Sequence, residues 1–151
     1  MRPLFLGMLV AALLAGGGCG TFAPFEVDLP LIPSGKLSDE EVIAAVLDDV
    51  HRGMQEAQVY RVLAHVSRNY RDAEGRDYAA IQEYLREIFS RYRELRITRV
   101  PPRIRVNGYE ATAVETFGTV AEPFNASQAP PLQLQGQVTV YLEKVDNRWL
   151  I

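Results

Sequence analysis

The sequence is poor in the residues on which metal sites, disulfides and nucleic-acid binding depend. Its 151 residues contain one cysteine, two histidines and one tryptophan. A single cysteine cannot form an internal disulfide, and neither paired-cysteine nor HExxH metal motifs occur. The formal net charge of -3 lacks the basic excess that nucleic-acid-binding proteins carry. We therefore expect no metal site, no cofactor and no nucleic-acid partner.

The sequence also lacks an apolar run long enough to span a bilayer. The longest apolar run covers residues 4–14, after Met1 and Arg2, and small residues lead from it to Cys19. A basic start followed by a short apolar run and small residues is typical of a secretory signal. A cysteine directly after small residues resembles a bacterial lipobox, in which that cysteine is lipidated. The alternatives are a plain export signal cleaved near Gly18 and a retained N-terminal anchor.

This pattern predicts three parts of the chain. Residues 1–18 are expected to be a signal peptide, residues 19–37 a lipidated Cys19 with a proline-containing tether, and residues 38–151 a domain. Stable attachment to a membrane takes more than one acyl chain, which lipoprotein-type modification supplies. We therefore expect an exported protein anchored in the cell envelope, on the periplasmic side.

The domain begins with helical patterns. Ser38 followed by Glu41 forms a capping-box signature, and the apolar residues after it recur at helical spacing. A short helix is expected over residues 59–67, and Asp77 is expected to cap a third helix over residues 78–92.

The second half of the domain alternates with a period of two, which predicts strands over residues 95–100, 103–106, 109–120, 132–145 and 148–151. Asn107-Gly108 predicts a hairpin, and Asp146-Asn147 predicts a second turn. In the longest strand the even-numbered residues are aliphatic or glycine and are expected to be buried under the helices: Leu132, Leu134, Gly136, Val138, Val140 and Leu142.

Helices followed by an antiparallel meander indicate an α+β fold, with N-terminal helices packed on a curved antiparallel sheet. The order of elements, together with the ending EKVDNRWLI, resembles the nuclear transport factor 2-like superfamily of SnoaL-type proteins and ketosteroid isomerase. The resemblance covers residues 38–151 and implies a cystatin-like cone. It includes no catalytic motif, and this fold hosts many unrelated functions.

Ketosteroid isomerase-like chemistry needs a carboxylate base and hydrogen-bond donors that face a dry pocket. Glu115, in the middle of a predicted strand, is the candidate base, and Tyr70, Tyr84 and Tyr109 are candidate donors or ligand-binding residues. Both faces of this strand mix polar and apolar residues, so Glu115 could equally face solvent. His65 could pair with a carboxylate such as Asp72.

An arginine-rich stretch covers residues 86–105, and we interpret it as a solvated face whose arginine stems cover the sheet. The alternative is a surface that meets anionic lipid head groups or an acidic partner. The sequence favours a non-catalytic envelope lipoprotein that binds a small apolar ligand or an envelope protein. The alternative is a small isomerase- or hydrolase-like enzyme that uses Glu115 as base. A homodimer through the wet face of the sheet, with Gln133, Gln135, Thr139 and Tyr141, is also compatible with the pattern.

Overall fold

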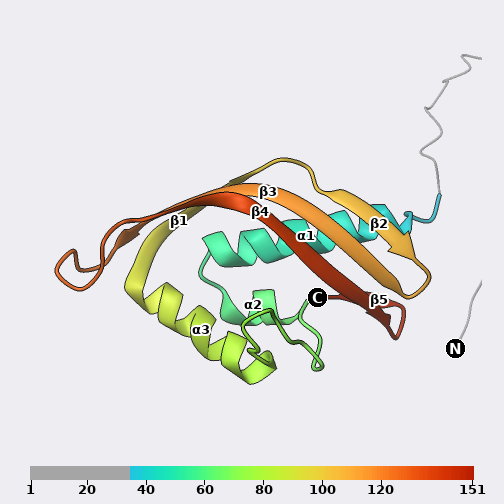
Figure 1. Ribbon diagram of the computed structural model, residues 1–151, viewed down its shortest axis with the longest axis horizontal. Helices are drawn as coiled ribbons and strands as arrows, with labels where there is room; N and C mark the ends of the chain where they lie inside the picture. Colours follow the sequence, from blue (N-terminus) through green and yellow to red (C-terminus); the bar gives the residue numbers. More distant parts are fainter. Residues whose placement is uncertain (1–34) are drawn as a thin grey trace, which may run out of the picture. The chain divides into compact units, whose positions relative to one another are not determined.

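The computed structural model describes residues 35–151, so the expected signal peptide and Cys19 lie outside the described residues. Three helices are followed by five strands: α1 (Asp39–Gln55), α2 (Val59–Leu63), α3 (Tyr78–Arg91), β1 (Tyr92–Arg99), β2 (Arg103–Asn107), β3 (Glu110–Pro123), β4 (Leu132–Val145) and β5 (Arg148–Leu150). The strands form one curved antiparallel sheet that arches over the helices (Figure 1). The predicted α+β fold, with helices packed on one face of a curved sheet, is confirmed. No helix in residues 35–151 has the length and hydropathy needed to cross a membrane.

The helix starts follow the capping signals in the sequence. The Ser38 hydroxyl accepts a hydrogen bond from the Glu41 amide, and the Glu41 carboxylate accepts one from the Ser38 amide. These contacts satisfy amides that the first turn leaves without a helical partner. Asp77 caps α3 through the Ala80 amide at 2.9 Å. The second helix ends at Leu63 rather than Ser67, because turns replace the helical pattern after it.

The sheet is organised around β3, which pairs with β1, β2 and β4. β4 pairs with β3 along 12 residue pairs, from Glu110 opposite Glu143 to Ala121 opposite Leu132. On the other edge of β3, β2 pairs with residues 110–114 and β1 with residues 117–123. The predicted hairpin between β2 and β3 is present, but its two turn residues are Gly108 and Tyr109, one position later than expected. Gly108 adopts a φ of 63°, which suits the glycine-first turns that join twisted strands.

Two groups of buried apolar residues hold the layers together. The first joins α1 to the sheet and contains Ile43, Leu47, Ala111, Ala113, Leu142 and Trp149. The second lies among the helices and contains Val62, Leu63, Val66 and Leu85. The Trp149 indole is 2% exposed and donates to the carboxylate of Asp39 at 3.0 Å, so the short β5 is fixed to the start of α1.

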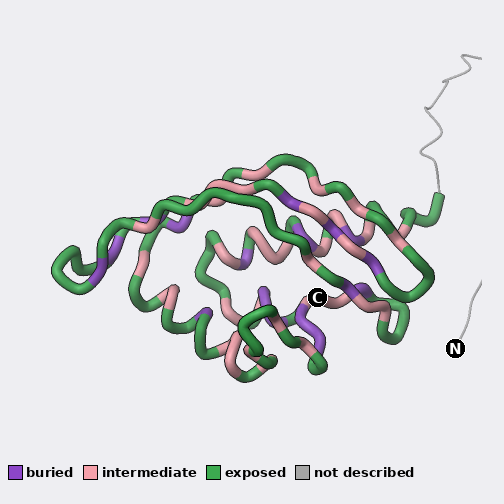
Figure 2. The backbone as a smooth tube through the Cα atoms, viewed as in Figure 1, coloured by how far each residue is buried: buried purple, intermediate pink, exposed green. Residues whose placement is uncertain are grey.

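The expectation that the whole even-numbered face of β4 is buried is wrong. Leu142 is buried and Val140 partly buried, but Leu134 is 53% and Val138 40% exposed. The helices pack mainly on β1, β2 and β5, and the end of β4 that joins the β3–β4 loop lies beyond α1 (Figures 1 and 2). The 17 residues of α1 span about 26 Å, whereas the 14 residues of β4 span about 48 Å. Alternation predicts which side of the strand faces inward, but not whether a helix lies under it.

The outer edge of β4 is open over most of its length. β5 pairs with β4 only through residues 143–145. Within residues 35–151, positions 132–142 of this edge therefore have no neighbouring strand.

A substitution at Gly53 tests the close contact between α1 and α2. A methyl group at Gly53 would lie 3.0 Å from Val62 Cγ2 and 3.2 Å from the Val62 amide nitrogen. We expect Gly53→Ala to lower the free energy of unfolding by about 1 kcal/mol in urea denaturation, because overpacking outweighs the gain in helix propensity. Gly136→Ala is the control, since nothing lies within 4 Å of its added methyl group, and it should be neutral or slightly stabilising. A Gly53→Ala variant as stable as the unsubstituted protein would contradict the packing.

Candidate functional site

Glu115 lies on the inward face of β3. It is 2% exposed and follows two buried alanines of the same face, Ala111 and Ala113. Of the two orientations that the sequence left open, the structure has the one in which Glu115 points toward the helices. A carboxylate this deeply buried is costly unless cations or hydrogen-bond donors surround it.

Two cationic or potentially cationic side chains surround the Glu115 carboxylate. His51 Nε2 of α1 lies 2.9 Å from Oε2, and Arg99 Nη1 of β1 donates to Oε1 at 3.1 Å. Arg99 also pairs with Asp48 on the exposed side of α1. These four side chains form the Glu115 network, which joins α1, β1 and β3. Both carboxylate oxygens of Glu115 are engaged.

The balance of these contacts sets the protonation of Glu115. Burial by itself raises the pKa of the carboxyl group. The hydrogen bond from His51, the charge of His51 and the charge of Arg99 together outweigh burial, so the pKa of Glu115 lies below that of an ordinary glutamate. Glu115 is therefore ionised at neutral pH and is a weak proton acceptor, which is the opposite of a carboxylate base tuned by a raised pKa.

A second network joins α1 to α2. Asp49 Oδ1 accepts from Arg61 Nε at 3.0 Å and from Arg61 Nη2 at 2.7 Å, and its Oδ2 lies 2.8 Å from His65 Nε2. The hydrogen bonds from Arg61 and His65 lower the pKa of Asp49 to about 2. The suggested pairing of His65 with Asp72 is wrong, because Asp72 accepts from Arg76 within its own loop.

The three candidate tyrosines do not surround Glu115, whose hydrogen-bond donors are His51 and Arg99. Tyr109 is 77% exposed in the β2–β3 turn. Tyr84 is partly exposed, and its ring stacks against the Arg76 guanidinium at 4.5 Å. Tyr70 packs on the second core group, where burial is the main cause that raises the pKa of its hydroxyl.

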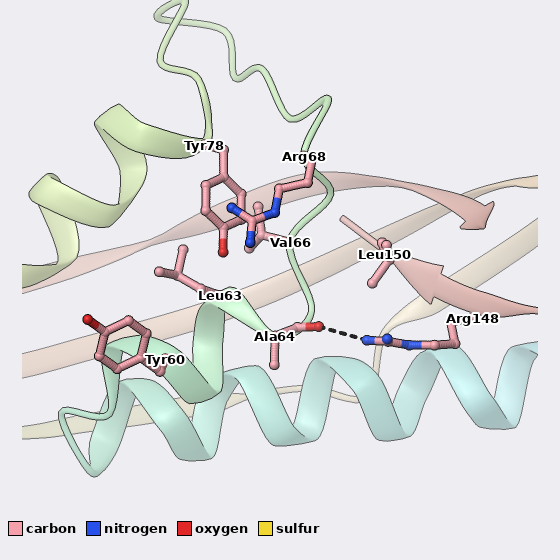
Figure 3. Close-up of a pocket in the computed structure, with 8 residues that line it drawn as sticks. All are labelled: Tyr60, Leu63, Ala64, Val66, Arg68, Tyr78, Arg148 and Leu150. Carbon is pink, nitrogen blue, oxygen red and sulfur yellow. Dashed lines mark hydrogen bonds between the residues drawn. The ribbon is translucent and has the colours of Figure 1, made fainter. Parts of the chain in front are cut away.

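A pocket of about 310 Å³ lies elsewhere, between α2, the segment after it, the start of α3 and β5 (Figure 3). Its lining residues are Tyr60, Leu63, Ala64, Val66, Arg68, Tyr78, Arg148 and Leu150. We call it the Arg68–Arg148 pocket. Neither Glu115 nor any of the three candidate tyrosines lines it. A second hollow, on the sheet, is lined by Arg99 and Phe117 among others, again without Glu115.

Neither the Glu115 network nor the Arg68–Arg148 pocket could be predicted from the sequence, although Glu115 itself was a candidate. His51 and Arg99 are 64 and 16 residues from Glu115, and no spacing pattern connects them. The lining of the Arg68–Arg148 pocket comes from four segments between residues 60 and 150. Within residues 35–151, no group of three histidine, cysteine, aspartate or glutamate side chains is arranged to hold a metal ion.

Comparison with known proteins gives structural but not sequence relatives. No protein-family model and no curated protein matches the sequence. Among solved structures, a nuclear transport factor 2-like superfamily protein from Salmonella enterica superposes with a TM-score of 0.62 at 16% identity, over 74% of this chain and 84% of that one. A cystatin-like protein of unknown function from Nostoc punctiforme gives 0.58 at 14% identity, over 77% and 89%.

An enzyme is also among these structural neighbours. A hexachlorocyclohexane dehydrochlorinase gives a TM-score of 0.60 at 12% identity, over 72% of this chain and 77% of that one. Identities at this level show the fold alone, and the helices, the curved sheet and the strand order agree with it. The chain has the nuclear transport factor 2-like fold.

Proposed function

We propose that the chain is an envelope lipoprotein, tethered to a membrane through Cys19, whose domain binds a ligand or a protein partner and does not catalyse a reaction. The observation that supports a non-catalytic domain is that both carboxylate oxygens of Glu115 contact side chains of the protein itself. This carboxylate is buried on the inward face of β3, and His51 and Arg99 contact both of its oxygens. A binding role needs only a pocket or a surface, and the Arg68–Arg148 pocket supplies one.

The alternative is a small enzyme of the same fold. The structural similarity to a dehydrochlorinase supports it only at the level of fold. One observation favours it independently: His65 is held by Asp49 at 2.8 Å, and a histidine oriented by a carboxylate is a common general base. Neither His65 nor Asp49 lines the Arg68–Arg148 pocket, so this pair lacks an adjoining cavity there.

The homodimer remains a part of the proposal. A dimer interface must be exposed in the free protomer. Four polar residues of β4 meet this requirement: Gln133, Gln135, Thr139 and Tyr141. Their amide and hydroxyl groups suit cross-strand hydrogen bonds at such an interface.

The pKa of Glu115 tests whether this carboxylate can act as a base. We expect the side-chain carboxyl carbon of Glu115, followed by NMR from pH 7 downward, to titrate below the pKa of an ordinary glutamate. The reason is that protonation of Glu115 must break its contacts with His51 and Arg99. A Glu115 midpoint above the ordinary glutamate value would overturn the non-catalytic proposal and favour a base.

The tether has a separate test. Cys19 is the only cysteine, and a lone thiol in an exported protein has no disulfide partner in its own chain. We expect a clickable fatty acid to label the protein expressed in a bacterium with lipoprotein processing, and Cys19→Ser to abolish that label. Cys19→Ser should also release the protein from the membrane fraction. Unchanged labelling of the variant would end the lipoprotein proposal.

A further inference from the structure

The Arg68–Arg148 pocket combines an apolar floor with two guanidinium groups. Leu63 and Val66 are buried members of the second core group, and Leu150 of β5 adds a third aliphatic side chain. Figure 3 shows Arg68 beside the ring of Tyr78 and Arg148 reaching toward Ala64. A volume of about 310 Å³ lies at the lower end of the range of small-molecule pockets, which is about 300–1,000 Å³. The pocket therefore suits a small ligand.

Both guanidinium groups are held in place by contacts that leave their charge free. The Arg68 guanidinium lies 4.1 Å from the centre of the Tyr78 ring, and Arg148 Nη2 donates to the Ala64 carbonyl at 3.1 Å. Neither an aromatic face nor a carbonyl neutralises a guanidinium as a carboxylate does. Within residues 35–151, Arg68 and Arg148 form no ion pair, whereas Arg61 and Arg76 each pair with two carboxylates.

The Tyr60 hydroxyl, which also lines the pocket, has a partner within the protein. The Tyr60 hydroxyl accepts from Arg86, whose guanidinium pairs with Glu83. Two backbone hydrogen bonds join Ile151, which follows β5, to the segment after α2: the Ile151 amide donates to the His65 carbonyl, and the Ser67 amide donates to the Ile151 carbonyl. The groups that remain available to a ligand are the two arginine charges, the Tyr78 hydroxyl and the aliphatic floor.

We propose that this pocket binds a small anionic amphiphile, with a carboxylate as the head group that meets Arg68 and Arg148 and a short hydrocarbon body on Leu63, Val66 and Leu150. The inference rests on the proposed binding function and names its ligand class. A planar guanidinium presents paired N–H donors that match a carboxylate. It narrows the expected small apolar ligand to one with an anionic head group, because a carboxylate can pair with the two arginine charges and an uncharged ligand cannot.

The test uses the full chain and three probes with the same hydrocarbon body: octanoate, octanol and octylamine. Binding is measured by NMR chemical-shift titration and calorimetry. We expect octanoate to bind about tenfold or more tightly than octanol, since a hydrogen bond to a charged group contributes that much or more. Octylamine should bind more weakly still. Equal affinities for octanoate and octanol would overturn the proposal.

Two pairs of substitutions locate the site. The double variant Arg68→Gln, Arg148→Gln should lose octanoate binding about tenfold or more and keep the octanol affinity of the parent. Arg103→Gln, Arg105→Gln is the matched control, because both arginines are exposed on β2 and the net charge changes equally. All four positions are exposed, and an unchanged thermal midpoint confirms folding. An equal loss in both double variants would overturn the site, because it would indicate attraction by net charge alone.

Vesicles distinguish the source of the head group. Displacement of octanoate by phosphatidylglycerol vesicles, but not by phosphatidylcholine vesicles, would support an anionic lipid as the natural ligand of the arginines. No displacement would support a free amphiphile. Octanoate binding together with a raised pKa of Glu115 would support the ligand class and overturn the non-catalytic function. Equal affinities for octanoate and octanol together with a lowered pKa of Glu115 would support the non-catalytic function and overturn the ligand class.

Discussion

The buried carboxylate of Glu115 is the constraint on which the domain depends most. It contributes a charge to the interior between the helical layer and the sheet, where an unpaired charge would be strongly destabilising. Only the correct placement of α1 and β1 brings His51 and Arg99 to its two oxygens. The apolar contacts of Ile43 and Trp149 also hold the helices on the sheet, but they fix the position of α1 along the sheet less strictly than the ionic contacts of Glu115 do. A single ionic network thus explains both the position of α1 under the sheet and the unsuitability of Glu115 as a base.

The helical layer covers only part of the sheet, and this determines where the domain can bind other molecules. Where α1 lies under β3 and β4, the inward face is buried and filled by Ala113, Leu142 and their neighbours. Leu134 and Val138, by contrast, are exposed, and the edge of β4 is unpaired over positions 132–142 within residues 35–151. The open part of the sheet and the Arg68–Arg148 pocket are the two surfaces of the domain that differ most from an ordinary solvated exterior.

The local elements could be predicted from the sequence because their signals are local. The capping box at Ser38, the Asp77 cap and the Asp146-Asn147 turn each depend on residues within four positions of one another. The candidate site could not be predicted in the same way. Alternation in β3 left the direction of Glu115 open, and its partners are supplied by α1 and β1 through tertiary packing. The exposure of Leu134 depends on the length of α1 relative to β4, which no pattern within β4 contains.

A double-mutant cycle on His51 and Glu115 tests the central claim most directly. The free energy of unfolding is measured for the parent, His51→Ala, Glu115→Gln and the double variant, with the exposed Glu122→Gln in place of Glu115→Gln as the control pair. A coupling between His51 and Glu115 of about 1 kcal/mol or more, with additive effects in the control pair, is the predicted result. Additivity of His51→Ala and Glu115→Gln to within about 0.3 kcal/mol would show that the network does not hold the layers together.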